Sequence, residues 1–348
     1  MYRRCSALLF VASTLLSGAA SAVEITGAGS SAAAPLYAKW AGSYQKQGGA
    51  TIHYQPVGSS SGIKQIKEKS ISFGASDVAL SREEAQKEKL ICFPSAISGV
   101  VPVVNLPGVK AGELQLTGEL LAGIYARKIV SWNDPGIAAV NPDIKLPKLA
   151  IVAVAREEGS GTTYNFTDYL SKVSASWKES FGTKFTPAWA NGVTLVKGSS
   201  AVSHAVKRTP GAIGYIDFSY IAQDQLHYAK VQNREGRFVA PSAFTFASAL
   251  SSSSWKTKAN FEELLTDQAG TNSWPITMGT FVIVPQVASN AEATTAALKF
   301  FTWAFMRGDG IVGDADFVRL PDRVQARIYN ELTKVTDKAG QPLRWSMM

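Results

Sequence analysis

The chain has 348 residues, of which 46% are hydrophobic and 18% are charged, a balance typical of globular proteins that excludes an intrinsically disordered chain. Lys and Arg outnumber Asp and Glu by 35 to 27. The basic residues are scattered, whereas nucleic-acid binding proteins gather them in a patch or stripe, so we expect no nucleic-acid partner. A chain of this length usually forms two domains.

The first 22 residues have the pattern of a secretory signal peptide. Arg3 and Arg4 precede a short apolar run at residues 7–16, and Ala20-Ser21-Ala22 is a small-residue cleavage site. The apolar run is too short to span a membrane. The sequence therefore predicts that residues 1–22 are removed on export and that the mature protein has one remaining cysteine and no internal disulfide.

The first part of the mature chain alternates strands with helices. Leu36, Trp40 and Tyr44 recur at helical spacing after Pro35, which suits the first position of a helix. Alternation of this kind predicts a parallel sheet with right-handed crossovers, and ligands bind such sheets at the carboxyl ends of the strands. The strands are predicted at residues 23–26, 51–57 and 71–75.

The middle of the chain is predicted to form a second unit. Residues 110–145 are expected to be mostly helical, and residues 149–155 to form an apolar strand. Two extended apolar runs, near 99–105 and 275–284, bracket this segment, and the simplest topology uses both as hinge strands between two domains. The predicted fold is therefore α/β, with each domain a mostly parallel sheet flanked by helices. The predicted domains are residues 23–103 plus 277–348 and residues 104–276.

Three loops rich in glycine and serine each stand between a predicted strand and a predicted helix. A helix N-terminus carries unpaired N–H groups and about half a positive charge, so it favours anions. Arg156 precedes the third loop and adds a planar guanidinium suited to phosphate or carboxylate. Together the loops predict one oxyanion held from several sides. The loops are Gly27-Ala28-Gly29-Ser30-Ser31, Gly58-Ser59-Ser60-Ser61-Gly62 and Gly159-Ser160-Gly161-Thr162-Thr163.

The first loop also matches the dinucleotide-binding fingerprint, with Ala32 in its third glycine position. That fold requires an acidic residue about 20 residues later, and the second strand here ends at Gln55-Pro56-Val57-Gly58 with no acid. Pro35 also begins the helix one turn late for this motif. We therefore expect no nicotinamide cofactor, and the sequence indicates no other cofactor.

The second loop matches the G-x-S-x-G nucleophile elbow of serine hydrolases, which makes Ser60 an alternative nucleophile. A hydrolase also needs a histidine base, and His204 and His227 follow later in the chain, neither in a distinctive context. The sequence leaves this secreted hydrolase open as an alternative but favours a protein that is not an enzyme. Metal binding has no support, because the three histidines are far apart and no paired ligand spacing occurs.

Asp77 stands at the end of the third predicted strand, beside loops that otherwise offer donors. Structurally, it suits a helix cap or a partner for Arg156. Functionally, it suits an oxyanion that carries a proton, because monohydrogen phosphate can donate to a carboxylate and sulfate at neutral pH cannot. A buried acceptor left without a donor costs about 1–3 kcal/mol, so Asp77 would select protonated oxyanions.

Seven short blocks of the sequence recur together in one known family. They are Thr26-Gly27-Ala28-Gly29, Ala34-Pro35-Leu36-Tyr37-Ala38-Lys39-Trp40, Gly58-Ser59-Ser60, Phe73-Gly74-Ala75-Ser76-Asp77, Gly159-Ser160-Gly161-Thr162, Pro210-Gly211-Ala212-Ile213-Gly214-Tyr215 and Trp274-Pro275-Ile276-Thr277. Each block alone is a weak signal. Together, and over almost the whole mature chain, they make the sequence resemble the periplasmic phosphate-binding proteins of bacterial phosphate ABC transporters.

The resemblance implies a two-domain clamshell of the type II-like periplasmic binding proteins, which closes on phosphate at the hinge. It also implies that Glu158 supports the site by pairing with Arg156. The chain departs from the family at Ala32, where an aromatic residue is frequent, and at Ser61, where a glycine is common. The phosphate-binding residues that the resemblance implies are Ser31, Ala32, Ser59, Asp77, Arg156, Ser160, Gly161 and Thr162.

The expected function is therefore that of a high-affinity periplasmic receptor. It would bind inorganic phosphate and deliver it to an inner-membrane ABC permease driven by an ATPase. We expect a monomer without a metal or a cofactor. The residues alone support an oxyanion receptor, so a receptor for another tetrahedral oxyanion remains the alternative.

Overall fold

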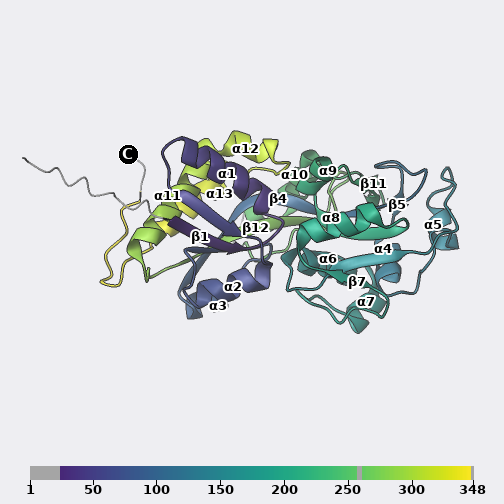
Figure 1. Cartoon of the computed structure of the whole chain (residues 1–348), viewed down its shortest axis with the longest axis horizontal. Coiled ribbons are helices and arrows are strands. Elements are labelled where there is room, and N and C mark those ends of the chain that lie inside the picture. Colours follow the sequence, from purple (N-terminus) through teal and green to yellow (C-terminus); the bar gives the residue numbers. More distant parts are fainter. Residues whose placement is uncertain (1–23, 257–260, 346–348) are drawn as a thin grey trace, which may run out of the picture.

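The computed structural model describes residues 24–256 and 261–345 as an elongated α/β protein with two lobes along its long axis (Figure 1). The predicted signal peptide at residues 1–22 lies outside the described residues. No helix in the described part of the chain is long and apolar enough to cross a membrane.

The first lobe consists of residues 24–99 and 277–345. Its elements are β1 (Glu24–Gly29), α1 (Ala34–Lys46), β2 (Thr51–Gln55), α2 (Ser59–Lys67), β3 (Phe73–Ser76), α3 (Arg82–Lys87), the first part of β4 (Leu90–Val104), β12 (Thr277–Pro285), α11 (Ala291–Arg307), α12 (Asp309–Asp314) and α13 (Asp322–Leu332). Strand β1 pairs in parallel with β2 and β3, as the alternation of strands and helices predicts. Strand β12 lies antiparallel between β3 and β4.

The second lobe consists of residues 100–276. Its helices are α4 (Gly118–Tyr125), α5 (Pro135–Ala139), α6 (Gly161–Val173), α7 (Ala175–Ser180), α8 (Gly198–Arg208), α9 (Ser219–Asp224), α10 (Ala243–Ser252) and the 3₁₀ turn Ser254–Lys256. Its strands are β5 (Gln115–Leu116), β6 (Val152–Arg156), β7 (Thr194–Val196), β8 (Ala212–Asp217), β9 (His227–Tyr228), β10 (Lys230–Gln232) and β11 (Phe238–Val239). Strands β7, β6 and β8 are parallel neighbours, and β8 pairs antiparallel with the end of β4. Strands β11, β10 and β5 form a small separate sheet.

The chain passes between the lobes along two adjacent segments. Strand β4 pairs with β12 up to Gly99 and with β8 from Val100 onward. The chain returns at Ile276, whose carbonyl oxygen accepts from the N–H of Val100 at 2.8 Å. The indole of Trp274 donates to the carbonyl of Val100 at 3.0 Å, which fastens the two segments to each other. Both crossing points fall within the runs near 99–105 and 275–284.

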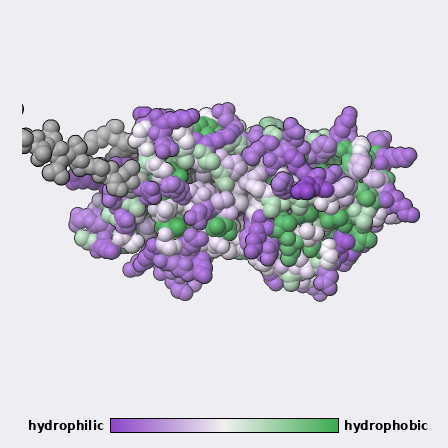
Figure 2. Space-filling view, viewed as in Figure 1, coloured by the Kyte–Doolittle hydropathy of each residue, from purple (hydrophilic) through white to green (hydrophobic). Residues whose placement is uncertain are grey.

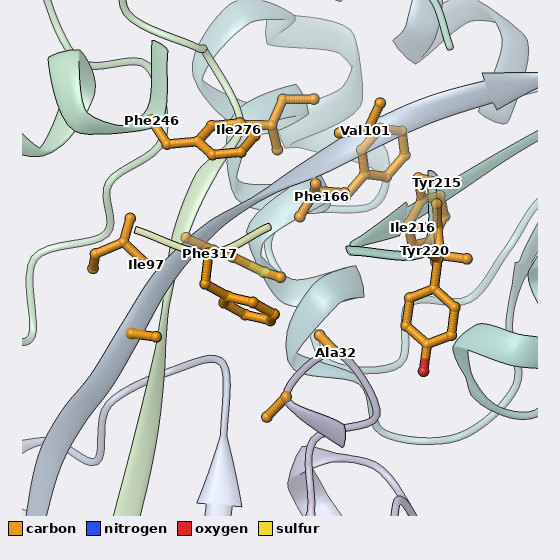
Figure 3. Close-up of a cluster of buried hydrophobic side chains, with 14 of the residues drawn as sticks. Ala32, Ile97, Val101, Phe166, Tyr215, Ile216, Tyr220, Phe246, Ile276 and Phe317 are labelled. Carbon is orange, nitrogen blue, oxygen red and sulfur yellow. The ribbon is translucent and has the colours of Figure 1, made fainter. Parts of the chain in front are cut away.

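Most of the buried apolar side chains form one cluster that extends through both lobes, and Ile66, Leu80, Leu90 and Ile283 form a second, smaller cluster in the first lobe. Figure 3 shows part of the larger cluster, with Ile97 and Phe317 from the first lobe and Phe166 and Tyr215 from the second. The rings of Phe166 and Tyr215 stack with their centres 4.3 Å apart, and each fully buried large side chain contributes about 1.5–3 kcal/mol. The outer surface is mainly hydrophilic on the face that Figure 2 shows. The buried apolar side chains therefore hold each lobe rigid around the crossing segments.

One predicted stretch differs from the structure. Residues 110–145 contain strand β5 and the short helices α4 and α5, joined by turns and loops, so the prediction of a mostly helical stretch is wrong. Gly112 has a left-handed backbone with φ +76°, and Pro135 begins α5 after a loop. These residues interrupt a helix because glycine favours turns and proline cannot continue a helical hydrogen-bond ladder.

Candidate functional site

The three predicted loops meet where the two lobes touch, at the carboxyl ends of β1, β2 and β6, beside the end of β3. Strand β3 ends directly before Asp77, and β6 ends at Arg156. Helices α2 and α6 begin at the second and third loops. Of the nine predicted residues, three in the first lobe bond directly to the second lobe: Ser31 to Ser199, Ser59 to Gly161 and Asp77 to Thr162. All nine are buried except Glu158, which is partly buried.

The first loop places three small residues before α1. The hydroxyl of Ser30 accepts from the N–H groups of Ala32 (3.1 Å) and Ala33 (3.2 Å), so it satisfies two of the free donors at this helix start. The hydroxyl of Ser31 shares a hydrogen bond of 2.8 Å with Ser199 in the second lobe. The N–H of Ala32, which the resemblance assigns to phosphate, therefore has a partner within the protein.

Asp77 is buried and accepts from three hydroxyl groups. Its Oδ1 atom accepts from Ser30 at 2.5 Å and from Thr280 at 3.3 Å. Its Oδ2 atom accepts from Thr162 of the second lobe at 3.3 Å. Burial raises the pKa of Asp77 to about 6, although the hydroxyls and the charge of Arg156 act in the opposite direction. At neutral pH the side chain is therefore mostly an ionised acceptor.

Ser59 joins the two lobes at the N-terminus of α6. Its hydroxyl oxygen accepts from the N–H of Asp77 at 3.2 Å and from the N–H of Gly161 at 3.1 Å. A side chain at position 161 would bring a Cβ atom within 2.5 Å of this oxygen and 2.8 Å of the Cβ of Asp77. Glycine is therefore required at 161, because the backbone approaches the first lobe so closely.

Arg156 enters the cluster from the end of β6 and is 1% exposed. Its Nε atom donates to Oε1 of Glu158 at 2.7 Å, and its Nη2 atom donates to the same oxygen. The Nη1 atom donates to the hydroxyl of Ser199 at 3.4 Å. Glu158 thus holds one edge of the guanidinium, and this is the pair that the resemblance implies. The Oε1 atom of Glu158 also accepts from the N–H of Gly198 at 3.1 Å.

Ser160 caps α6 and fixes the direction of its N-terminus. The Ser160 hydroxyl accepts from the N–H of Thr163 at 3.2 Å, so the first turn of α6 begins at Gly161 with its positive end toward Ser59 and Asp77. The junction therefore combines a buried guanidinium, a helix N-terminus and hydroxyl groups with one ionised acceptor. Such a set can hold a small oxyanion, because directed donors replace the water that a buried charge loses.

Comparison with known proteins identifies the family. Residues 17–307 match the model of the PBP superfamily domain. The phosphate-binding protein PstS of Haemophilus influenzae is 42% identical over 312 residues, which cover 90% of this chain and 93% of that protein. The PstS protein of Pasteurella multocida is also 42% identical, over 92% of this chain and 94% of its own. The chain belongs to the PstS family of phosphate-binding proteins.

Solved structures agree with this family in fold. A high-affinity periplasmic phosphate-binding protein, solved with phosphate bound, has a TM-score of 0.69 and 22% sequence identity to this chain. The likeness covers 88% of this chain and 93% of that protein. Together with the superfamily match, it confirms the predicted α/β fold of the periplasmic binding proteins.

Three further residues of the junction were not predicted as site residues from the sequence. Ser30 and Thr280 donate to Asp77, and Ser199 contacts both Ser31 and Arg156. A signal for Ser199 was present, since Gly198-Ser199-Ser200 follows a strand and begins a helix, as the three recognised loops do. Thr280 lies within β12, where a strand that is buried almost throughout gives no such signal.

The alternative sites receive no support from the structure. Ser60 lies in the first turn of α2, and its N–H donates to the carbonyl of Gly159 at 3.1 Å. His204 lies on α8, and the ring of His227 contacts the carbonyl of Val109 at 3.0 Å. Within residues 24–256 and 261–345, no hydrogen bond joins Ser60 to a histidine, and no group of three or more His, Cys, Asp or Glu side chains is placed to hold a metal ion.

Proposed function

We propose that this PstS-family protein is a high-affinity periplasmic receptor that binds inorganic phosphate and delivers it to an ABC transporter. The related proteins of Haemophilus influenzae and Pasteurella multocida carry the name phosphate-binding protein, which describes a binding protein and not an enzyme. The proposal rests on a buried hydrogen-bond donor and a buried acceptor at the lobe junction. These are the guanidinium of Arg156 and the carboxylate of Asp77.

The proposed binding mode assigns each side of the anion to one lobe. Arg156 and the N-terminus of α6, with Ser160, Gly161 and Thr162, donate to unprotonated phosphate oxygens. Asp77 accepts from the protonated oxygen through Oδ2, because its Oδ1 atom is already bonded to Ser30 and Thr280. In the first lobe, Ser31, Ala32 and Ser59 complete the proposed set of phosphate-binding residues.

The choice of anion follows from Asp77. Monohydrogen phosphate supplies a proton to this carboxylate, whereas sulfate at neutral pH leaves two acceptors facing each other. An unsatisfied buried acceptor costs about 1–3 kcal/mol, and more when it is charged. Arsenate has the same shape and protonation as phosphate, so the same argument supports a receptor for another tetrahedral oxyanion as the second candidate.

The proposed domains are residues 23–103 plus 277–348 and residues 104–276. The change of partners along β4 at Gly99 and the return of the chain at Ile276 support this division. Two short segments link the domains, so rotation about them would open and close the site. Phosphate would favour the closed arrangement, because only closure brings Arg156 close to Asp77.

The proposed location and partners follow from the same role. Residues 1–22 would direct export through the inner membrane, and the mature receptor would work in the periplasm as a monomer. Its partners would be phosphate, the inner-membrane ABC permease and the ATPase that drives it. No nucleic acid and no cofactor take part.

Titration calorimetry tests the proposal directly. Protein unfolded and refolded to remove bound anion is titrated with phosphate and, separately, with sulfate. We expect one phosphate site and little heat with sulfate. Absence of phosphate binding would overturn the proposal, and hydrolysis of a phosphate or carboxylate ester that Ser60→Ala abolishes would support the hydrolase instead.

A further inference from the structure

Two hydroxyl groups of the second lobe hold Ser31 from opposite ends of the residue. The Ser31 hydroxyl shares a 2.8 Å hydrogen bond with the hydroxyl of Ser199 and accepts from the N–H of Ser199 at 3.3 Å. The carbonyl oxygen of Ser31 accepts from the hydroxyl of Tyr220 at 2.9 Å. Figure 3 shows the Tyr220 hydroxyl directed toward the loop that carries Ala32. The first loop is therefore bonded to α8 and α9 as well as to α1.

Both side chains are fixed by their surroundings. Ser199 is 1% exposed in the first turn of α8, and Tyr220 is 5% exposed in α9. Burial raises the pKa of Tyr220 to about 12, so its hydroxyl keeps the proton that it donates.

Ser199 also touches the charged group of the site. Its hydroxyl oxygen accepts from Nη1 of Arg156 at 3.4 Å, on the side of the guanidinium that Glu158 does not occupy. Ser199 thus contacts one proposed phosphate-binding residue in each lobe, Ser31 and Arg156. Its position depends on the lobes being together, because Ser31 and Ser199 belong to different lobes.

We propose that Ser199 and Tyr220 are positioning residues that form a latch on Ser31, which slows the release of the bound anion without choosing which anion binds. The inference rests on the proposed phosphate-receptor function. The latch bonds join protein groups only, so they stabilise the closed arrangement equally for any anion inside. Asp77 differs, because its Oδ2 atom faces the proposed anion position and Thr162.

Two conservative variants test the latch, each with a matched control. Tyr220→Phe and Ser199→Ala each remove one hydroxyl and leave the buried carbon framework in place. Tyr169→Phe removes a buried hydroxyl that bonds to the Gln232 carbonyl at 3.3 Å, away from the site. Ser203→Ala removes a buried hydroxyl on α8 that bonds to Asp224. The rate of phosphate release is measured with radiolabelled phosphate and an unlabelled chase, and phosphate and arsenate affinities by calorimetry.

We expect Tyr220→Phe and Ser199→Ala each to speed phosphate release about two- to tenfold, the range for loss of one hydrogen bond. The ratio of phosphate to arsenate affinity should stay unchanged, and both control variants should release phosphate at the wild-type rate. If wild type binds phosphate but the latch variants release it no faster than the controls, the latch is excluded and the receptor function stands. A wild type that binds no phosphate would overturn both.

Discussion

Two of the helices that begin at the site, α1 in the first lobe and α6 in the second, differ in the groups that surround their first turns. At α6 the cap Ser160 accepts from Thr163, and Arg156 adds a full positive charge beside the helix start. At α1 the hydroxyl of Ser30 accepts from two N–H groups and donates to Asp77. In the proposed binding mode, the second lobe therefore attracts an anion, and the first lobe presents it with an acceptor.

This difference separates affinity from selectivity. Donors attract every oxyanion, so the second lobe alone would bind phosphate and sulfate alike. An acceptor penalises every anion that brings no proton, so the first lobe decides which anion remains. A single substitution should therefore change either the affinity or the selectivity for anions and leave the other almost intact. Substitutions at single residues test this difference between the lobes.

The largest effect is expected at Arg156. Arg156→Met should lower phosphate affinity at least a hundredfold, about 3 kcal/mol, because the other charged and polar groups of the site lose their cation. The double variant Arg156→Met with Glu158→Gln removes the carboxylate that would otherwise be left unpaired, so protein stability and affinity can be separated. Calorimetry with phosphate measures the change.

Arg208→Met is the control for net charge, because Arg208 is exposed at the end of α8 in the same lobe. It should bind phosphate almost as wild type does. Equal losses of phosphate affinity at positions 156 and 208 would show that the net positive charge, and not the buried guanidinium, provides the affinity. The proposed difference between a donor lobe and an acceptor lobe would then be wrong.

A second buried carboxylate, Asp217 on β8, belongs to the second lobe. It therefore tests whether the carboxylate of the first lobe alone selects the anion. Its Oδ1 atom accepts from the N–H and the hydroxyl of Ser219, and its Oδ2 atom has no hydrogen-bond partner within the described residues. Burial raises the pKa of Asp217 from 3.8 to about 7. The folded protein therefore keeps this proton over a pH range in which the unfolded chain has lost it.

The linkage gives the sign of the pH effect. The stability that the folded protein gains from the protonated Asp217 side chain is fully present below about pH 4. It is lost as the pH rises through about 7. Asp217→Asn cannot ionise, so the variant should be more stable than wild type by on the order of 4 kcal/mol at alkaline pH and equal to it near pH 4. Urea unfolding followed by tryptophan fluorescence at both pH values measures the difference.

Asp217→Asn should leave the ratio of phosphate to sulfate affinity unchanged, because Asp217 lies on the crossing segment opposite Val100 and not among the donors. A changed ratio would mean that the carboxylates of both lobes select the anion. The contrast between an acceptor lobe and a donor lobe would then be wrong.

The smallest effect is expected at Ser60. Its contact with the second lobe uses the backbone N–H, which Ser60→Ala retains. Phosphate affinity should change less than about threefold, within the range of substitutions that remove no buried hydrogen bond. Ser59→Ala is the matched comparison, because it removes the hydroxyl that accepts from Asp77 and Gly161. A larger loss of phosphate affinity at Ser60 than at Ser59 would mean that Ser60, and not Ser59, is the phosphate-binding residue of the second loop.

The sequence predicts most of this site because each loop obeys a local rule. A glycine or serine loop between a strand and a helix leads to free N–H groups, and parallel strands bring their carboxyl ends to one edge. Arg156, Ser59 and Asp77 follow from these rules or from the family blocks. The parallel order of β1, β2 and β3 follows in the same way from the strand and helix periods.

Contacts between parts of the chain that are distant in sequence depend on tertiary packing and were missed. Thr280 reaches Asp77 from a strand about 200 residues later in the chain, and no local pattern marks it. The first half of β4 was also not predicted, since Pro94 cannot donate within a sheet. The structure accommodates Pro94 where the pairing register shifts between Thr280 and Phe281, the kind of bulge in which a strand tolerates proline.

The central claim is that Asp77 selects the protonated anion, and one comparison tests it most directly. Phosphate and sulfate affinities are measured by calorimetry at neutral pH for wild type and for Asp77→Asn, whose amide can donate to an unprotonated oxygen. We expect the ratio of phosphate to sulfate affinity to fall at least about tenfold in the variant, while phosphate affinity itself falls less. An unchanged ratio would contradict the account.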